Sequence, residues 1–150
     1  MKALLQRVTK ASVSVNNECV SSIKHGLLIF LGVEKGDTQN EANYLIRKIA
    51  NLRIFEDDKG KMNLSIQDVK GEILLVSQFT LAGDTSKGNR PGFDNAAKPD
   101  IANDLYLYFC NQIKKENITV KCGIFQADMK VELINDGPVT FMLEKRNMEK

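Results

Sequence analysis

The sequence has little of the machinery that common enzymes and metalloproteins require. Its 150 residues include one histidine, His25, and no tryptophan. It contains no Gly-x-Ser-x-Gly elbow, Walker phosphate loop, His-Glu-x-x-His pair or Gly-x-Gly-x-x-Gly turn. Serine-hydrolase, nucleotide-binding and zinc-protease chemistry of those kinds are therefore not indicated. Because His25 lies in a predicted turn beside Gly26, we favour a structural turn residue over a base or a ligand.

Cysteine is also scarce, with Cys19, Cys110 and Cys122 as the whole set. The count is odd, the spacings are long, and no Cys-x-x-Cys pair occurs. A disulfide framework or a zinc site is therefore not expected. We interpret the three cysteines as small buried apolar residues in a reducing compartment.

Long apolar runs and a strong excess of one charge are absent as well. Runs such as 27–31 are far shorter than the roughly 18 residues of a membrane span. Residues 1–7 turn polar too early for a signal peptide, so we expect a soluble, cytoplasmic protein with no membrane partner. The net charge of +2 does not indicate a long nucleic-acid footprint, although a protein that grips only the end of an RNA strand is compatible with it.

The composition that is present, 43% hydrophobic and 27% charged, is that of a globular chain, and we expect one domain over residues 1–150. Thr38-x-x-Glu41 is a capping box that opens a helix over 39–51, and Pro99 opens a second helix. Neighbouring strands are mostly joined as hairpins, so we predict an α+β fold with a largely antiparallel sheet. Apolar runs predict strands at 3–8, 12–15, 19–23, 27–33, 53–55, 73–79, 118–120, 124–125, 129–134 and 139–143.

The first segment with the placement of a functional site is formed by Ser77, Gln78, Phe79 and Thr80, where a buried strand meets a long polar loop at 81–98. Where such a strand stops pairing, its backbone N–H groups become free to bind a ligand. The alternative is an ordinary strand end whose hydroxyls satisfy the turn. Without a histidine base, Ser77 or Thr80 would be a weak nucleophile, so hydrolysis here should use an activated bond and backbone donors.

The second segment is residues 135–140, which contain Asp136-Gly137-Pro138 between two alternating runs. This pattern predicts a tight hairpin turn. A sharper interpretation is a cis Gly137–Pro138 bond, which costs only about 0.5–1 kcal/mol before proline. Such a bond would point two neighbouring carbonyl groups the same way, as a rigid acceptor clamp for an amino group. Both interpretations stay open at this point.

The third segment is residues 87–93 of the long loop, with Lys87, Arg90 and Phe93 among glycines. Two cations and an aromatic ring suit a phosphate group or the face of a base. A solvated surface loop is the alternative.

Two of these segments, residues 77–81 (SQFTL) and 135–140 (NDGPVT), together resemble the two signature motifs of the D-aminoacyl-tRNA deacylases. They occur in the order of that family, about 60 residues apart. The resemblance covers essentially the whole chain, because further segments are similar to the family at 6–8, 11–13, 88–91 and 125–129.

The resemblance implies a homodimeric hydrolase with a layered β/β/α fold, whose partner is the aminoacylated end of tRNA. It would release D-amino acids from D-aminoacyl-tRNA, would accept glycyl-tRNA mischarged on a non-cognate tRNA, and would need no metal or cofactor. The catalytic pocket would be formed by Ser77, Gln78, Phe79 and Thr80. Water would attack the ester while the N–H groups of Phe79 and Thr80 form an oxyanion hole. The Thr80 hydroxyl as nucleophile is the weaker alternative.

The substrate-binding residues implied by the resemblance come from other parts of the chain. Gly137 and Pro138 of one subunit would enter the active site of the other as a clamp that reads the handedness of the amino acid. Arg7 would brace this clamp, while Phe125 and Met129 would line the pocket for the terminal adenine.

Two other classes of protein compete with this reading. A non-enzymatic nucleic-acid-binding module would use Lys87, Arg90 and Lys98 for phosphate contacts and would show a steep salt dependence. The small net charge argues against it. A purely structural homodimer gives no reason for the two motif segments to occur together.

Overall fold

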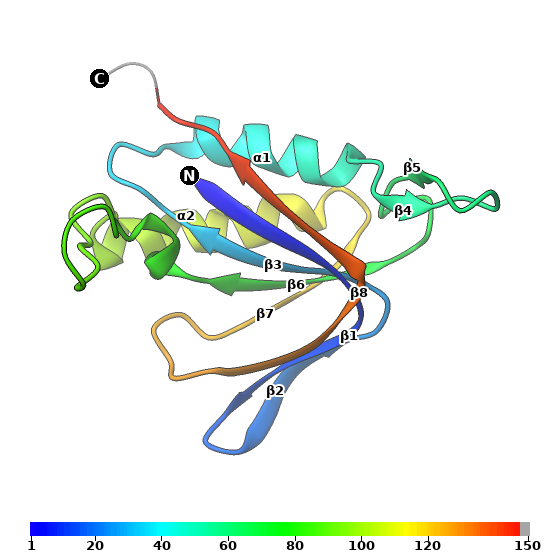
Figure 1. Cartoon of the computed structure of the whole chain (residues 1–150), viewed down its shortest axis with the longest axis horizontal. Coiled ribbons are helices and arrows are strands. Elements are labelled where there is room, and N and C mark those ends of the chain that lie inside the picture. The colour runs from blue at the N-terminus through cyan, green and yellow to red at the C-terminus, as the bar shows by residue number, and fades with distance from the viewer. Residues whose placement is uncertain (148–150) are drawn as a thin grey trace.

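The computed structural model describes residues 1–147, which form eight strands, two α-helices and a 3-10 helix (Figure 1). The helices are α1 (Gln39–Asn51), η1 (Phe79–Ala82) and α2 (Pro99–Lys114). The strands are β1 (Lys2–Val15), β2 (Glu18–Ile23), β3 (Gly26–Gly32), β4 (Phe55–Glu56), β5 (Met62–Leu64), β6 (Glu72–Ser77), β7 (Thr119–Cys122) and β8 (Lys130–Glu144).

Six strands form one mixed sheet in the order β2-β1-β3-β6-β7, with β8 paired to β1. Strand β1 is antiparallel to β2, β3 and β8, whereas β3, β6 and β7 run parallel to one another. The predicted α+β class and the antiparallel majority are confirmed. The parallel centre was not expected from the hairpin pattern. It arises because the chain crosses from β3 to β6 through α1, and from β6 to β7 through α2.

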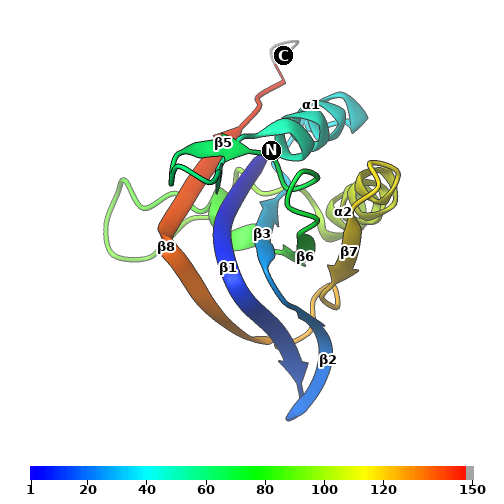
Figure 2. The same cartoon turned by 90° about the vertical axis from the view of Figure 1, so that its right-hand side faces the viewer.

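The elements are arranged in three layers. Helices α1 and α2 cover one face of the sheet, and β1 and β8 curve so that their far halves, with β2, pass beneath the other face (Figure 2). Strand β6 is buried on both sides, as its apolar run predicts. Its residues Ile73 and Leu75 pack in the core under the helices, while Leu74 and Val76 pack in a second core against the curved strands.

The helix boundaries agree with the sequence pattern because local side chains set them. The Thr38 hydroxyl accepts a hydrogen bond from the Asn40 N–H at 3.1 Å, and Glu41 accepts one from the Thr38 N–H at 2.6 Å. The capping box of α1 is therefore confirmed. Pro99 is the first residue of α2, as expected. Within residues 1–147, no helix is both long and apolar enough to cross a membrane.

The hairpin predicted at residues 135–140 is wrong. Strand β8 runs through this segment without reversing, because β1 pairs with both of its halves, from Leu4↔Met142 to Ser12↔Glu132. The register shifts next to Val8, so the Asp-Gly-Pro sequence is accommodated as an irregularity within one long strand. For the same reason β1 is one strand rather than the two predicted at 3–8 and 12–15.

Three smaller predictions are also corrected. Strand β6 ends at Ser77, and Phe79 already belongs to η1. Residues 124–125 form no strand but lie in the loop that follows β7. The short strand predicted at 53–55 is found one to two residues later as β4, which pairs with β5.

Candidate active site

A pocket of about 830 Å³ lies where the parallel strands β3, β6 and β7 end. In sheets of this kind the carboxyl ends of parallel strands are the usual place for a ligand. The walls come from the end of β6, from the loop before α2 together with the first turn of α2, and from the loop between β7 and β8. The lining residues used below are Val33, Ser77, Gln78, Phe79, Phe93, Pro99, Phe125 and Met129.

Ser77, Gln78 and Phe79 line the pocket at the change from strand to 3-10 helix, and Thr80 follows them just outside the lining. The Gln78 N–H still donates to the Leu31 carbonyl at 2.8 Å, so β6 remains paired up to this point. The next two N–H groups, of Phe79 and Thr80, belong to the first turn of η1, where helical N–H groups have no internal partner. No acceptor for either is found among residues 1–147. Two adjacent main-chain donors are thus available at the pocket.

Contacts between neighbouring side chains fix the side chains of residues 78–80. The Gln78 side-chain amide donates to the Thr80 hydroxyl oxygen, so this hydroxyl serves as an acceptor. Phe79 is 57% exposed, and its ring meets Phe93 edge-on with centroids 5.1 Å apart. The sequence placed Phe93 in a candidate contact loop, and the structure brings it to the rim of this pocket.

The opposite wall is formed by the loop after β7. Phe125 lies against Tyr106 of α2, with ring centroids 6.1 Å apart. The Tyr106 hydroxyl donates to the carbonyls of Leu75 at 2.9 Å and Gly123 at 3.1 Å, so it ties β6 to this loop. Met129 packs so closely on Gly123 that a Cβ added there would lie 2.8 Å from the Met129 sulfur. The sequence shows no sign of a role for Tyr106, because it lies on the apolar face of α2 among the core residues.

The remaining predicted site residues form a second group elsewhere. Arg7 is 4% exposed; its Nη1 donates to the Ile54 carbonyl at 2.9 Å, and its Nε donates to the Asp136 carbonyl at 3.2 Å. The next peptide bond along β8, Gly137–Pro138, is cis, and both residues are exposed. Gly137 has φ +125°, and a Cβ added to it would lie 3.0 Å from Arg7 Nη2.

Within one chain the two groups do not meet. Neither Arg7 nor Gly137 lines the pocket at the end of β6; both line a separate pocket together with His25. Strands β8, β1, β3 and β6 are neighbours in that order within the sheet, and of β8 only Val131, near its start, curves back to line the pocket. The structure therefore brings together Ser77, Gln78 and Phe79 with Phe125 and Met129. Thr80 follows Phe79 in the chain but does not line the pocket, and the Arg7 and Gly137 group lies apart.

The other candidates flagged from the sequence are far from catalytic geometry. His25 lies edge-on to Phe55, with ring centroids 5.3 Å apart, beside Gly137 rather than Thr80. Lys87 and Arg90 are exposed on a loop that Asp84 and Gly92 close with two backbone hydrogen bonds. Hydrogen bonds from Ser86 lower the pKa of the Asp84 carboxyl. In the described part of the chain, no group of three or more His, Cys, Asp or Glu side chains could hold a metal ion.

A pocket with free main-chain donors on a layered α+β scaffold is suited to a hydrolase that works without a strong side-chain base. The comparisons with known proteins agree. Residues 4–144 match the family model of D-Tyr-tRNA(Tyr) deacylase. The chain is 62% identical to the D-aminoacyl-tRNA deacylase of Geotalea daltonii and 54% identical to that of Thermosipho melanesiensis, each over 99% of both chains. The chain therefore belongs to the D-Tyr-tRNA(Tyr) deacylase family, which the sequence motifs predicted, and this is a family of hydrolases.

Two solved structures share the fold. One, described as c-Myc DNA Unwinding Element Binding Protein, is 45% identical with a TM-score of 0.92 and covers 98% of this chain and 100% of its own. The other, described as a probable eukaryotic D-amino acid tRNA deacylase, is 17% identical with a TM-score of 0.81, covering 95% of this chain and 97% of its own. The second likeness concerns the fold alone.

Proposed function

We propose that this chain hydrolyses the ester bond of D-aminoacyl-tRNA and releases the D-amino acid and the tRNA. The observation that carries the proposal is the pair of free N–H groups of Phe79, which lines the pocket, and of Thr80, the next residue in the chain. An aminoacyl ester is already activated, so its hydrolysis needs a stabilised oxyanion more than a strong nucleophile. Family membership and the names of the relatives support the same substrate.

In the proposed reaction, water attacks the ester carbonyl and the Phe79 and Thr80 N–H groups hold the resulting oxyanion. Loss of one such donor typically costs about 10²–10³ in rate. The terminal ribose 2′-OH of the substrate would help to orient the water. The Thr80 hydroxyl is the weaker nucleophile candidate, because it accepts a hydrogen bond from Gln78 and the chain's one histidine lies beside Phe55.

The shape of the pocket suits the end of an RNA strand. Phe125 and Met129 would contact the terminal adenine, since aromatic rings and thioethers both pack well on a base face. The first turn of α2, with Pro99, borders the same pocket, and the positive end of this helix dipole would favour a nearby phosphate. No cofactor takes part in this scheme.

The clamp is proposed to come from a second copy of the chain. Among residues 1–147, strand β8 pairs with β1 alone and leaves one edge of 15 residues open, which is the usual template for association. Ile134, Phe141 and Met142 on this strand are 38–50% exposed and flank Gly137 and Pro138. Docking of a second copy along β8 would bring these two residues to a pocket that they do not reach in their own chain.

In the dimer, the Gly137 and Pro138 carbonyls would accept hydrogen bonds from the substrate α-amino group, and Arg7 would hold this segment through the Asp136 carbonyl. With the amino group fixed, an L side chain would point into the wall, and a D side chain would face open space. Glycine has no side chain to reject. We therefore expect glycyl-tRNA mischarged on a non-cognate tRNA to be cleaved as well.

A DNA-binding module is the second candidate, because the structural relative at 45% identity is described as a DNA element binding protein. Lys87, Arg90 and Lys98 would then contact phosphates, and binding would weaken steeply with salt. This candidate predicts no turnover of an aminoacyl ester.

Paired deacylation assays on D-Tyr-tRNA and L-Tyr-tRNA, both with EDTA present, separate these candidates. We expect release of D-tyrosine and little release of L-tyrosine. Equal cleavage of the two substrates would refute the clamp. Absence of cleavage together with salt-sensitive binding of duplex DNA would favour the second candidate. Sedimentation of the purified chain tests the dimer.

A further inference from the structure

The outer face of α1 carries a groove that the proposed active site does not use. Its volume is about 490 Å³, and it is lined by Tyr44, Arg47, Lys48, Asn51, Leu52 and Arg53. Arg47 and Lys48 are exposed, and no carboxylate belongs to the lining. Tyr44 forms its centre, with the Lys145 ammonium 4.9 Å and the Lys48 ammonium 5.9 Å from the ring. We refer to this set with Lys145 as the α1 groove.

The cations of the α1 groove are not neutralised by the fold. Among residues 1–147, none of Arg47, Lys48, Arg53 and Lys145 takes part in an ion pair. Arg53 is held in place, since its Nε donates to the Asn63 carbonyl at 2.8 Å. In a chain with a net charge of only +2, four cations without an ion pair at one groove are a local concentration of positive charge. Polyanions are the complementary ligand.

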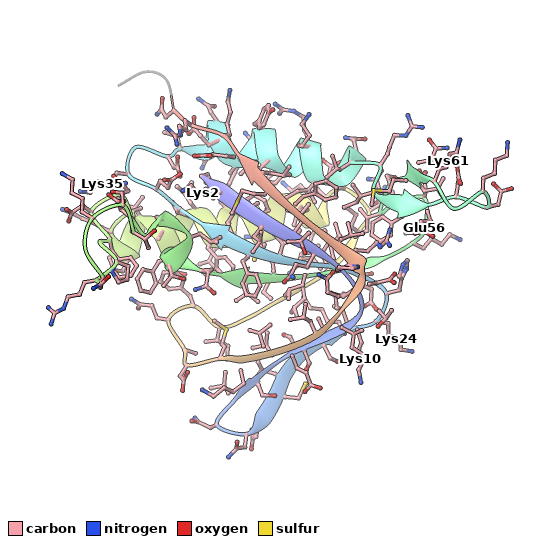
Figure 3. All side chains as sticks on the ribbon, viewed as in Figure 1. Lys2, Lys10, Lys24, Lys35, Glu56 and Lys61 are labelled. Carbon is pink, nitrogen blue, oxygen red and sulfur yellow. The ribbon has the colours of Figure 1, made fainter. Side chains whose placement is uncertain are left out.

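The helix that carries the α1 groove begins beside the pocket. Just before α1, the Lys35 N–H donates to the Asn95 carbonyl at 2.9 Å, and Ala96 and Ala97 line the pocket. Helix α1 therefore starts at the pocket rim and runs about 20 Å away from it, at 1.5 Å for each of its 13 residues. Lys35 marks the rim end in Figure 3. An RNA whose single-stranded end occupies the pocket could extend along this helix.

We infer that the α1 groove binds the sugar-phosphate backbone of the substrate tRNA beyond its terminal nucleotides. This inference rests on the proposed function and assigns a surface to its RNA partner. Arg47 and Lys48 provide the phosphate contacts, and Tyr44 offers an apolar surface to a ribose. Such contacts raise affinity without reading sequence, so one deacylase could accept tRNAs of many identities.

The test is the double variant Arg47→Ala/Lys48→Ala, with Lys24→Ala/Lys121→Ala as the charge-matched control. In Figure 3, Lys24 lies at the lower right, below the corner of β8 and β1, whereas α1 runs along the top, and both control lysines are exposed. We expect KM for D-Tyr-tRNA to rise about tenfold or more in the groove variant. We also expect the slope of log kcat/KM against log salt to fall by about 2, one for each phosphate contact. D-tyrosyl-adenosine, which lacks the rest of the tRNA, should be cleaved equally by all forms.

Two outcomes would overturn the inference. One is an unchanged salt slope and KM in the groove variant; the other is an equal loss with D-tyrosyl-adenosine. If the wild-type chain cleaves no substrate, the proposed function fails, and binding of uncharged tRNA is then measured instead. A loss of tRNA affinity confined to the groove variant would still support the surface, and equal affinity of all forms would refute it.

An independent observation concerns two cysteines that the sequence gave no reason to pair. The sulfurs of Cys110, on α2, and Cys122, the last residue of β7, lie 2.8 Å apart, and both thiols are free. Cys110 is buried and Cys122 is half-buried. The hydrogen bond from the Cys110 thiol, helped by the charge of Lys114, lowers the pKa of Cys122 to about 7 against the effect of burial. The same hydrogen bond to Cys122, together with burial, raises the pKa of the Cys110 thiol.

The geometry points to Cys110 and Cys122 as a dithiol that hydrogen peroxide converts to a disulfide. The Cys122 thiolate attacks a peroxide oxygen and breaks the O–O bond, which leaves a sulfenic acid and, after proton uptake, water. The Cys110 sulfur then attacks the Cys122 sulfur, its proton leaves with the hydroxyl group as a second water, and the S–S bond forms. Two thiols and one peroxide thus give one disulfide and two waters.

Oxidation would act on the pocket through the neighbours of Cys122. The next residue, Gly123, binds the Leu75 carbonyl through its N–H at 2.9 Å and accepts from Tyr106. Tyr106 in turn supports Phe125 in the pocket wall. Closing the sulfurs to bonding distance moves this loop relative to α2.

Peroxide treatment followed by thiol counting in denaturant tests the dithiol. We expect the thiol count to fall from three to one, with dithiothreitol restoring it. The rate should rise as the pH passes through about 7, because Cys110, Tyr106 and Lys114 set the thiolate fraction of Cys122. In the control variant Cys19→Ser, the thiol count should fall from two to none. Failure of the wild-type chain to lose two thiols together, or the same loss in Cys110→Ser, would overturn the proposal.

Discussion

The fold exposes the main chain of two polar segments, residues 77–80 and residues 136–138, in opposite ways. The first segment ends a central strand, so the N–H groups of Phe79 and Thr80 point free of the sheet as donors. The second lies inside β8, which stays paired to β1 on both sides, and its main chain is held from behind by Arg7. One region supplies donors and the other acceptors.

The difference has a structural origin in the partners of each strand. Strand β6 lies between β3 and β7, which enclose it on both edges and leave only its carboxyl end open. In the described part of the chain strand β8 has one partner, so Gly137 and Pro138 are exposed along an open edge. A reaction that needs both regions at once has to bring a second chain to the pocket. The predictions below test the donor region and the acceptor region separately.

The largest expected effect comes from removing a main-chain donor. Phe79→Pro deletes one N–H at the first position of η1, where a helix tolerates the missing N–H and fixed φ of proline. We expect a loss of about 10²–10³ in single-turnover rate on D-Tyr-tRNA. Phe79→Ala removes the same ring and keeps the N–H, so it should lose far less. Equal rates for the two variants would show that the ring, not the donor, matters.

In the acceptor region, Gly137→Ala should produce the next largest effect. The added Cβ would lie 2.7 Å from Val139 Cγ2 and 3.0 Å from Arg7 Nη2, at a φ of +125° that disfavours alanine. Displacing the clamp by about 1 Å should cost about 10²-fold in kcat/KM. Gly60→Ala is the control, since Gly60 also has positive φ but no atom within 4 Å of an added Cβ. A Gly137→Ala enzyme as active as Gly60→Ala would remove Gly137 from the site.

The two regions also differ in how far the sequence predicts them. The position of Ser77 to Thr80 followed from a buried apolar run that ends in a polar loop, which is local information. The hairpin expected at Asp136-Gly137 was wrong, because β1 pairs along the whole of β8 and this long-range pairing overrides a local turn signal. Helix α1 agrees with the helix predicted at about 39–51, because its capping box is a local signal.

What the sequence could not give is the distance between the groups. The motif segments were expected to act together across two subunits, and only the fold reveals that within one chain they line separate pockets. The closeness of Cys110 and Cys122 was hidden in the same way, because it depends on how α2 packs on β7. Tyr106 has the pattern of a core residue, and its hydroxyl's link between Leu75 and Gly123 appears only in three dimensions.

A smaller effect is expected when the support of the clamp is weakened. Arg7→Lys keeps the charge, but one ammonium cannot reach the Ile54 and Asp136 carbonyls as the guanidinium does. Leaving the Ile54 carbonyl unpaired should lower the free energy of unfolding by about 1–3 kcal/mol in urea titrations. Activity should fall by about tenfold. Arg146→Lys, at an exposed ion pair with Glu144, is the control and should change stability by less than about 0.5 kcal/mol. Equal stabilities of the two variants would contradict this role for Arg7.

The smallest effects should come from the Thr80 side chain. Thr80→Ser keeps the hydroxyl that accepts from the Gln78 amide and should react within about threefold of the wild-type chain. Thr80→Val removes that acceptor, which is worth about 0.5–1.5 kcal/mol, so the single-turnover rate should fall by up to about tenfold.

Comparing Thr80→Val with Phe79→Pro separates the two mechanisms at the donor region. If main-chain donors carry the reaction, the proline variant is slower than the valine variant by at least about tenfold, because the valine variant keeps both N–H groups. If the Thr80 hydroxyl is the nucleophile, Thr80→Val is inactive while Thr80→Ser retains turnover, and a covalent acyl-enzyme should form before release. The geometry favours the first outcome, since the hydroxyl's hydrogen-bond partner is an amide donor, which cannot remove its proton.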